Sequence, residues 1–176
     1  MIDLAEEHEV YFAFKRQFAP EYSQSAYLAM RATEFAIGDY LDWPEGKLQV
    51  SPQARKHMIT LIEDLNRIKE YKEETLYLAA SLGDRYLVNL AVKNQPAPCL
   101  ILLAVITTLM AAKLEEPMQP SYNRMVRLVA SSWNLNIDKK DLIDLEEDII
   151  RQLDFDLHYN SPIPFLERFQ RIFNLD

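Results

Sequence analysis

The longest apolar run of the chain extends from Cys99 to Ala112 and contains no charged residue. A transmembrane helix needs roughly 20 consecutive apolar residues, so this run is too short to cross a bilayer. A helix that is apolar on every face is instead buried among other elements of a protein core. The run therefore predicts a helix at the centre of an α-helical bundle.

The composition supports an all-α, globular reading and excludes several classes of protein. Only three glycines occur in 176 residues, which argues against a β-rich fold with many tight turns. The net charge is −8 and no run of Lys or Arg is present, so a nucleic-acid partner is not expected. Cys99 is the single cysteine, which rules out an intrachain disulfide and a zinc site built on paired cysteines. The acidic start, MIDLAEEHEV, lacks the layout of a secretory signal, and we expect an intracellular protein without membrane insertion.

Proline, glycine and capping residues divide the chain into helical segments. Ser51 followed by Pro52 indicates a helix start, and Asp138 is typical of an N-cap. The apolar spacing predicts helices over residues 23–41, 51–68, 73–90, 100–112, 121–132 and 138–153, followed by a short helix in the tail. We expect an N-terminal arm over 1–22, one helical domain over 23–158 and a tail helix within 159–176.

Signals of catalysis are nearly absent from the sequence. His8, His57 and His158 lie far apart, and no HExxH spacing or glycine-rich phosphate loop occurs. The acidic residues at 146–148 and 115–116 are interpreted as solvated helix faces, because adjacent helix positions do not point at one site. No catalytic residue, metal ligand or cofactor is therefore predicted, and a free enzyme ranks third among the hypotheses.

Four amphipathic segments, in order and spacing, closely resemble the cyclin box, the helical module by which cyclins bind and activate protein kinases. The first segment carries Arg55, and the second contains the motif Asp84-Arg85-Tyr86-Leu87. The third carries Leu102 and ends in Ala111-Ala112-Lys113-Leu114-Glu115-Glu116; the fourth carries Leu145-Glu146 through Leu153, Phe155 and Leu157. The stretch Ser161–Leu166 resembles the linker that leads out of a first box.

The resemblance implies a five-helix cyclin box around the central apolar helix, with one preceding helix and a short C-terminal helix. It implies an internal ion pair between Arg55 and Asp84 and a buried core leucine at 102. It also implies that five residues contact a kinase: Lys113, Glu146, Leu114, Glu116 and Phe155. Taken without the resemblance, Lys113 has an ordinary interpretation as a helix cap, Glu146 as a solvated side chain, or the two as a pair.

Some features depart from the pattern and keep a second hypothesis open. Cyclins that dock substrates on the box carry an apolar motif and a tryptophan on the first helix, where this chain has Lys56 and Leu61. No RxxL destruction motif precedes the box, and the chain stops where a second box would begin, as in the Pho80-like and cyclin Y-like single-box cyclins. The leading hypothesis is a regulatory subunit of a cyclin-dependent-type kinase. The alternative is a cyclin-fold adaptor in a larger protein complex, for which the aromatic N-terminal arm is a docking candidate.

Overall fold

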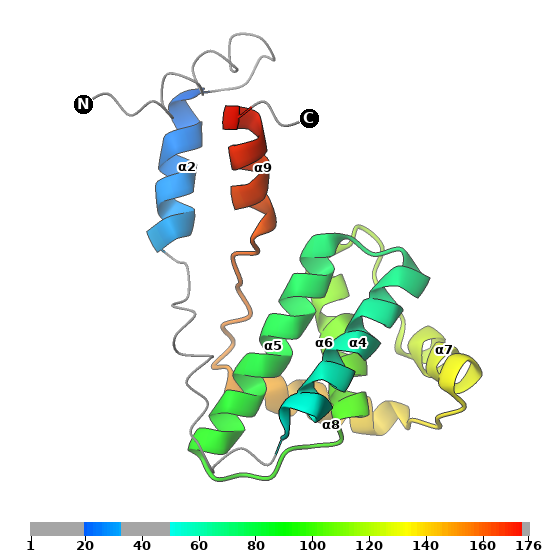
Figure 1. Cartoon of the computed structure of the whole chain (residues 1–176). Coiled ribbons are helices and arrows are strands. Elements are labelled where there is room, and N and C mark those ends of the chain that lie inside the picture. The colour runs from blue at the N-terminus through cyan, green and yellow to red at the C-terminus, as the bar shows by residue number, and fades with distance from the viewer. Residues whose placement is uncertain (1–19, 33–49, 174–176) are drawn as a thin grey trace. The chain divides into compact units, whose positions relative to one another are not determined.

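A computed structural model describes residues 20–32 and 50–173, and every regular element within them is α-helical. This confirms the all-α prediction. The helices are α2 (Pro20–Ala32), α4 (Pro52–Lys69), α5 (Glu73–Val92), α6 (Leu100–Glu115), α7 (Tyr122–Trp133), α8 (Lys139–Gln152) and α9 (Ile163–Phe173) (Figure 1). The chain divides into two compact units, one formed by Ala36–His158 and the other by Met1–Phe35 with Tyr159–Asp176.

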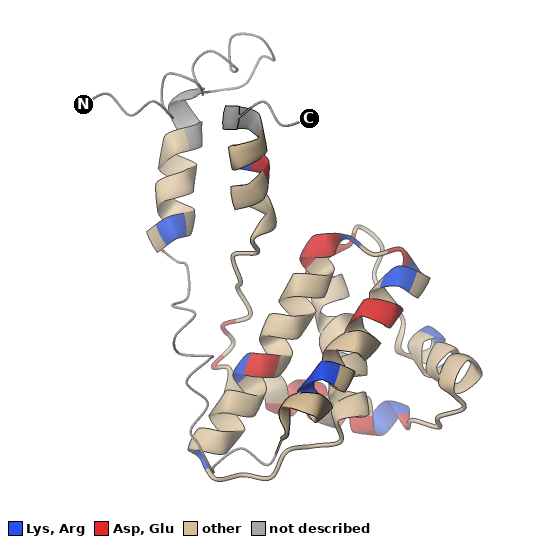
Figure 2. Cartoon of the chain, viewed as in Figure 1, with Lys and Arg blue, Asp and Glu red and all other residues tan. Residues whose placement is uncertain are grey.

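Helix α6 is the central element of the larger unit and contacts α4, α5, α7 and α8. Every residue from Leu103 to Ala112 is buried, so the apolar run lies in the core as the sequence predicts. Figure 2 shows that α6 is free of charge along most of its length. The hydroxyl groups of Thr107 and Thr108 donate back to the carbonyls of Leu103 and Ala104 at 2.9 and 2.8 Å, which satisfies these buried polar groups.

One core assignment from the sequence is wrong by one helix position. Leu102, expected to be a buried leucine, is only partly buried, whereas Leu103 is fully enclosed. Leu102 lies in the first turn of α6, where the helix is only beginning to enter the bundle. The buried stretch starts one residue later and continues on all faces of the helix.

Two helix starts that the sequence predicts are confirmed. The Ser51 hydroxyl accepts a hydrogen bond from the Ala54 amide at 3.2 Å, and Pro52 occupies the first turn of α4. The Asp138 carboxylate accepts from the Lys140 amide at 3.0 Å at the start of α8. Both side chains satisfy amides that have no partner inside their own helix, which is why these residue types mark helix N-termini.

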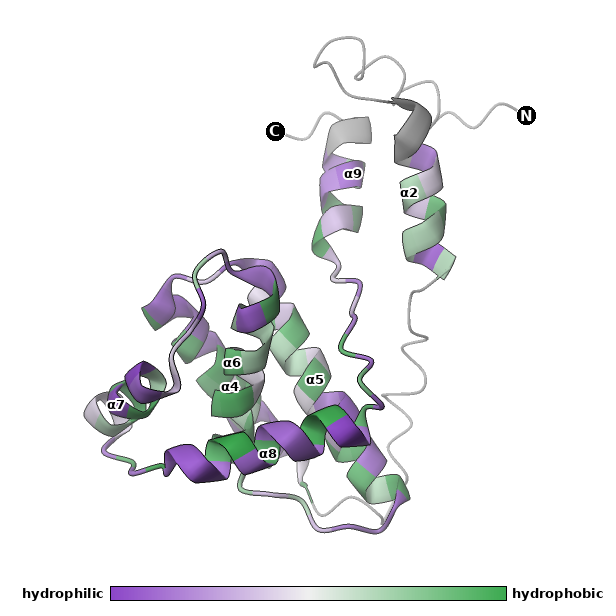
Figure 3. Cartoon of the chain, turned by 180° about the vertical axis from the view of Figure 1, so that it is seen from behind, coloured by the Kyte–Doolittle hydropathy of each residue, from purple (hydrophilic) through white to green (hydrophobic). Residues whose placement is uncertain are grey.

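The smaller unit pairs α2 with α9. The rings of Tyr27 and Phe165 meet edge to face at 5.9 Å, and the Arg168 guanidinium lies 3.6 Å from the centre of the Tyr27 ring. The Asn160 amide donates to the Met30 carbonyl at 2.9 Å. In Figure 3, the coloured parts of both helices carry hydrophilic as well as hydrophobic segments.

The domain expected over residues 23–158 stays a prediction. Of the two compact units, one contains α2 and α9, and the other contains the helices of Ala36–His158. Helix α2 begins at Pro20, three residues before the expected start. The remainder of the expected first helix and most of the N-terminal arm lie outside the described residues. None of the described helices combines the length and apolarity needed to span a membrane.

Candidate functional site: a Lys113–Tyr122–Glu146 cluster

Three helices bring Lys113, Tyr122 and Glu146 together. Lys113 lies in the last turn of α6, Tyr122 is the first residue of α7, and Glu146 lies in the middle of α8. The Lys113 ammonium donates to the Glu146 carboxylate at 2.5 Å and to the Tyr122 hydroxyl at 2.6 Å. The Tyr122 hydroxyl also donates to the second oxygen of Glu146. Each member of this cluster therefore bonds to both others.

The cluster lies at the surface, although it is partly enclosed. The side chains of Lys113 and Glu146 are 27% and 15% exposed. Lys113 and Glu146 thus pair with each other, which is one of the ordinary interpretations of these residues, and both stay partly exposed. The Lys113 ammonium is also 4.5 Å from the centre of the Tyr122 ring, a cation–π distance, and Lys139 approaches the same ring at 6.0 Å.

The charges of the cluster stabilise one another. Burial acts to lower the pKa of Lys113, but its hydrogen bonds to Glu146 and Tyr122 outweigh burial, so the pKa is raised overall. Burial and the hydrogen bond to Glu146 both raise the pKa of the Tyr122 hydroxyl. At neutral pH Lys113 is therefore an ammonium and Tyr122 a neutral phenol.

The carboxylate of Glu116 bonds to the start of α5 within the chain. One of its carboxylate oxygens accepts hydrogen bonds from the Lys72 amide at 2.8 Å and from the Thr75 hydroxyl at 2.6 Å. Lys72 is the N-cap of α5, and its ammonium donates to the Glu115 carbonyl at 3.2 Å. Glu116 therefore ties the C-terminal end of α6 to the start of α5.

Leu114 and Phe155 expose large apolar surfaces. Leu114 follows Lys113 and is 55% exposed, while Phe155 is 78% exposed in the turn after α8. Asp154 and Phe155 both have positive φ angles, 51° and 61°. A phenylalanine in this left-handed region is unusual, and such a conformation persists only where its surroundings hold it.

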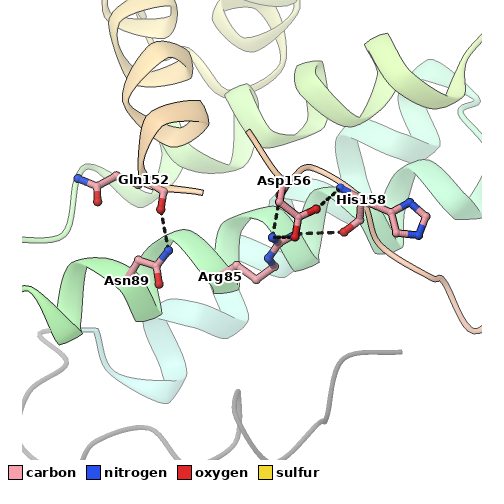
Figure 4. Close-up of polar contacts among 5 residues, drawn as sticks. All are labelled: Arg85, Asn89, Gln152, Asp156 and His158. Carbon is pink, nitrogen blue, oxygen red and sulfur yellow. Dashed lines mark hydrogen bonds and ion pairs between the residues drawn. The ribbon is translucent and has the colours of Figure 1, made fainter. Parts of the chain in front are cut away.

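Arg85 holds this turn from α5, as Figure 4 shows. Its guanidinium is nearly buried and donates to the Asp156 carbonyl at 2.7 Å, to the Asp156 carboxylate at 3.2 Å and to the His158 carbonyl at 3.1 Å. On the same helix, the Asn89 amide donates to the Gln152 carbonyl at 2.8 Å. These bonds fix the chain on both sides of the exposed Phe155 ring.

Arg55 and Asp84 connect α4 to α5. The guanidinium bonds to both carboxylate oxygens, with Nε at 2.8 Å and Nη2 at 2.5 Å. This two-point geometry is the strong form of an arginine–carboxylate contact. The hydrogen bond to Asp84 raises the pKa of Arg55, so the guanidinium stays charged throughout the accessible pH range.

Sequence reasoning missed three contributors to these contacts. Tyr122 carries no motif that links it to Lys113 or Glu146. Arg85 and Tyr86 lie inside the motif Asp84-Arg85-Tyr86-Leu87. Arg85 bonds to Asp156, and the Tyr86 hydroxyl donates to Asp148, and both partners lie more than 60 residues further along the chain. Among the described residues, no group of three or more His, Cys, Asp or Glu side chains is placed to hold a metal ion.

The helices of Ala36–His158 form an α-helical bundle whose surface carries a polar cluster and exposed apolar residues. The chain matches the family described as "Cyclin, N-terminal domain" over residues 25–158. It belongs to the cyclin family, whose members are non-enzymatic regulators of kinases.

Several cyclins of the B and A types are similar to this chain. G2/mitotic-specific cyclin-B3 of Mus musculus is 28% identical over 143 residues, covering 81% of this chain and 10% of the relative. Cyclin-B2-2 of Arabidopsis thaliana is 28% identical, covering 96% of this chain and 39% of the relative. Cyclin-A3-3 of the same plant is 30% identical over 138 residues, covering 77% and 39%. The chain thus spans well under half the length of these relatives.

Proposed function

We propose that this chain is the regulatory subunit of a cyclin-dependent-type protein kinase, which it binds and activates. The observation that carries the proposal is the placement of Lys113 and Glu146 on two different helices, side by side and partly exposed. An ammonium beside a carboxylate can donate to main-chain carbonyls and accept from main-chain amides of one partner segment. The pair therefore offers recognition of a polypeptide backbone.

The bonding capacity of the pair supports this role. The Lys113 ammonium has three N–H donors, of which Glu146 and Tyr122 take two. The Glu146 carboxylate accepts one bond on each oxygen and has further lone pairs. A partner can engage both charges without breaking the cluster. Lys113, Glu146, Leu114, Glu116 and Phe155 are the proposed kinase contacts, and the exposed Leu114 and Phe155 supply apolar contact area.

The mechanism involves no chemistry by this chain. An active kinase needs a helix glutamate paired with the lysine that positions the ATP phosphates. A partner that binds better to this arrangement than to the inactive one shifts the kinase population toward activity. The proposed site acts by such differential binding. The proposed setting is intracellular, in the cytoplasm or nucleus. The process is the cell cycle, since the B-type relatives are named G2/mitotic-specific cyclins.

The test is purification of the tagged full-length chain from the cells in which it occurs, followed by identification of its co-purifying proteins. We expect a cyclin-dependent-type kinase with the wild-type chain. Combining Lys113→Ala and Glu146→Ala should weaken kinase binding by about 2–5 kcal/mol, because each removes one side of a charged contact. The combination of Lys140→Ala and Glu147→Ala also removes one positive and one negative charge, but from exposed positions of α8, and serves as the matched control. A double variant that folds and retains its kinase at the control level contradicts the proposal.

A cyclin-fold adaptor without kinase activation is the second candidate. The observation that favours it is the face of α4, where Lys56 is exposed and Leu61 is partly buried, so an apolar substrate-docking surface is weakened there. Recovery of a stoichiometric complex that lacks a kinase would support this candidate. A grouping with the Pho80-like or cyclin Y-like single-box cyclins stays a prediction, since the relatives described above are B- and A-type cyclins.

A further inference from the structure

The Tyr122 hydroxyl lies between the two charges that the proposed function uses. It accepts from Lys113 and donates to Glu146, so it closes a ring of three hydrogen bonds across α6, α7 and α8. Without this hydroxyl, the ammonium and the carboxylate would have only each other as hydrogen-bond partners among the described residues. Tyr122 therefore adds a second anchor to each charged side chain.

We propose that Tyr122 is a positioning residue of the partner-binding site, which fixes Lys113 and Glu146 in their binding geometry before a partner arrives. The inference rests on the proposed function and adds a residue to it. Lysine and glutamate lose side-chain freedom when a partner immobilises them, and this loss weakens binding. Side chains that are already held in place have less freedom to lose, so the complex forms with higher affinity.

The bonding pattern favours positioning over a blocking role. A blocking residue would occupy the donors and acceptors that a partner needs. In the cluster, one Lys113 N–H and further carboxylate lone pairs remain outside the three mutual bonds. Tyr122 can therefore keep both of its hydrogen bonds while a partner's main chain binds to the same two charges.

The ring of Tyr122 makes a clean test possible. Lys113 and Lys139 lie 4.5 and 6.0 Å from the ring centre, and Tyr122→Phe keeps these cation–π contacts while it removes the hydroxyl. Tyr77→Phe removes a hydroxyl from an exposed tyrosine of α5 and is the matched control. Glu146→Gln retains the shape of the glutamate but removes its charge.

The experiment measures the affinity of the full-length chain for one recombinant cyclin-dependent kinase, taken from those that co-purify with the wild-type chain. We expect Tyr122→Phe to weaken binding about tenfold, chiefly through faster dissociation, with the thermal midpoint of the free chain close to that of Tyr77→Phe. In the Glu146→Gln background the same change should weaken binding less than twofold, because the geometry it maintains is already lost. If the role of Tyr122 were purely structural, Tyr122→Phe would lower the thermal midpoint of the free chain. Its effect on binding would then add to that of Glu146→Gln.

The outcomes separate this inference from the proposed function. If the variant lacking Lys113 and Glu146 loses kinase binding but Tyr122→Phe binds as tightly as wild type, the function stands and the positioning role is overturned. Tighter binding by Tyr122→Phe would show a blocking role and also overturn it. If no kinase binds, or none depends on Lys113 and Glu146, the proposed function itself fails.

Discussion

Arg55 and Asp84 lie 29 positions apart, yet the guanidinium of one bonds to both carboxylate oxygens of the other. The two side chains differ in environment: Arg55 is 41% exposed, whereas Asp84 is only 15% exposed. A salt bridge of this kind lies between the surface pairs that contribute little and the buried pairs whose disruption is costly. This difference in exposure decides which residue's replacement costs more stability.

Replacing Arg55 should destabilise the protein more than replacing Asp84. Arg55→Met leaves a mostly enclosed carboxylate without its partner, and we expect the free energy of unfolding to fall by about 2–3 kcal/mol. Asp84→Asn leaves an arginine that can turn toward water, and the expected loss is about 1–2 kcal/mol. Urea denaturation of both variants measures the difference. Equal losses, or a larger loss for Asp84→Asn, would contradict this account.

Local sequence signals predict most of the helical framework because they act within one turn of chain. Ser51 and Asp138 mark the starts of α4 and α8, and the uncharged run identifies α6 as the central helix. Leu102 shows the limit of such signals. An all-apolar helix has no polar face to define which residue first enters the core, so the depth of each leucine depends on how the other helices pack around it.

The candidate site could be predicted only in part, and the reason is tertiary. The family resemblance named Lys113 and Glu146, but Tyr122 joins them only because α7 starts beside the end of α6 and the middle of α8. Glu116 lies inside the motif, but one of its contacts could not be predicted. Its place in the motif gives no sign that its carboxylate turns toward the first residues of α5. Contacts between helices that are distant in sequence carry no local pattern.

Glu116→Gln should loosen the start of α5. The carboxylate bonds to the Lys72 amide and the Thr75 hydroxyl, and a neutral amide is a weaker acceptor for both. We expect a loss of about 1 kcal/mol in unfolding free energy and faster amide exchange in the first turn of α5. Glu115→Gln, a neighbouring change whose side chain makes neither bond, is the control. Identical exchange in the two variants would exclude the capping role.

Arg85→Lys should release the turn that presents Phe155. A lysine cannot reproduce the planar fork that reaches the Asp156 and His158 carbonyls together, so the turn loses part of its support (Figure 4). We expect faster hydrogen exchange over residues 154–158 and a loss of about 1–3 kcal/mol in stability. Phe155→Ala, which removes an exposed ring, should change stability by less than about 0.5 kcal/mol. Unchanged exchange in Arg85→Lys would show that the turn is held by other contacts.

The stability of the protein should fall in alkaline solution, and Tyr86 should be a principal cause. Burial, followed by the hydrogen bond that its hydroxyl donates to Asp148 at 2.5 Å, raises the pKa of Tyr86 above its ordinary value of 10.0. The folded protein therefore keeps this proton at pH values where the unfolded chain has lost it. The stabilisation is complete below pH 10 and is lost as the pH rises through the folded pKa. The raised pKa values of Lys113 and Tyr122 act in the same direction.

Urea denaturation at pH 9, 10 and 11 can isolate the contribution of Tyr86. Wild-type stability should decrease across this range, since a single proton retained only in the folded state gives a slope of up to about 1.4 kcal/mol per pH unit. Tyr86→Phe should be less stable at neutral pH by about 1 kcal/mol, because Asp148 loses a donor, but its alkaline slope should be shallower. Asp148→Asn removes the carboxylate and leaves the phenol buried. Burial is the larger cause of the raised pKa, so this variant should retain most of the slope. A slope in Tyr86→Phe equal to that of wild type would assign the alkaline loss to other groups.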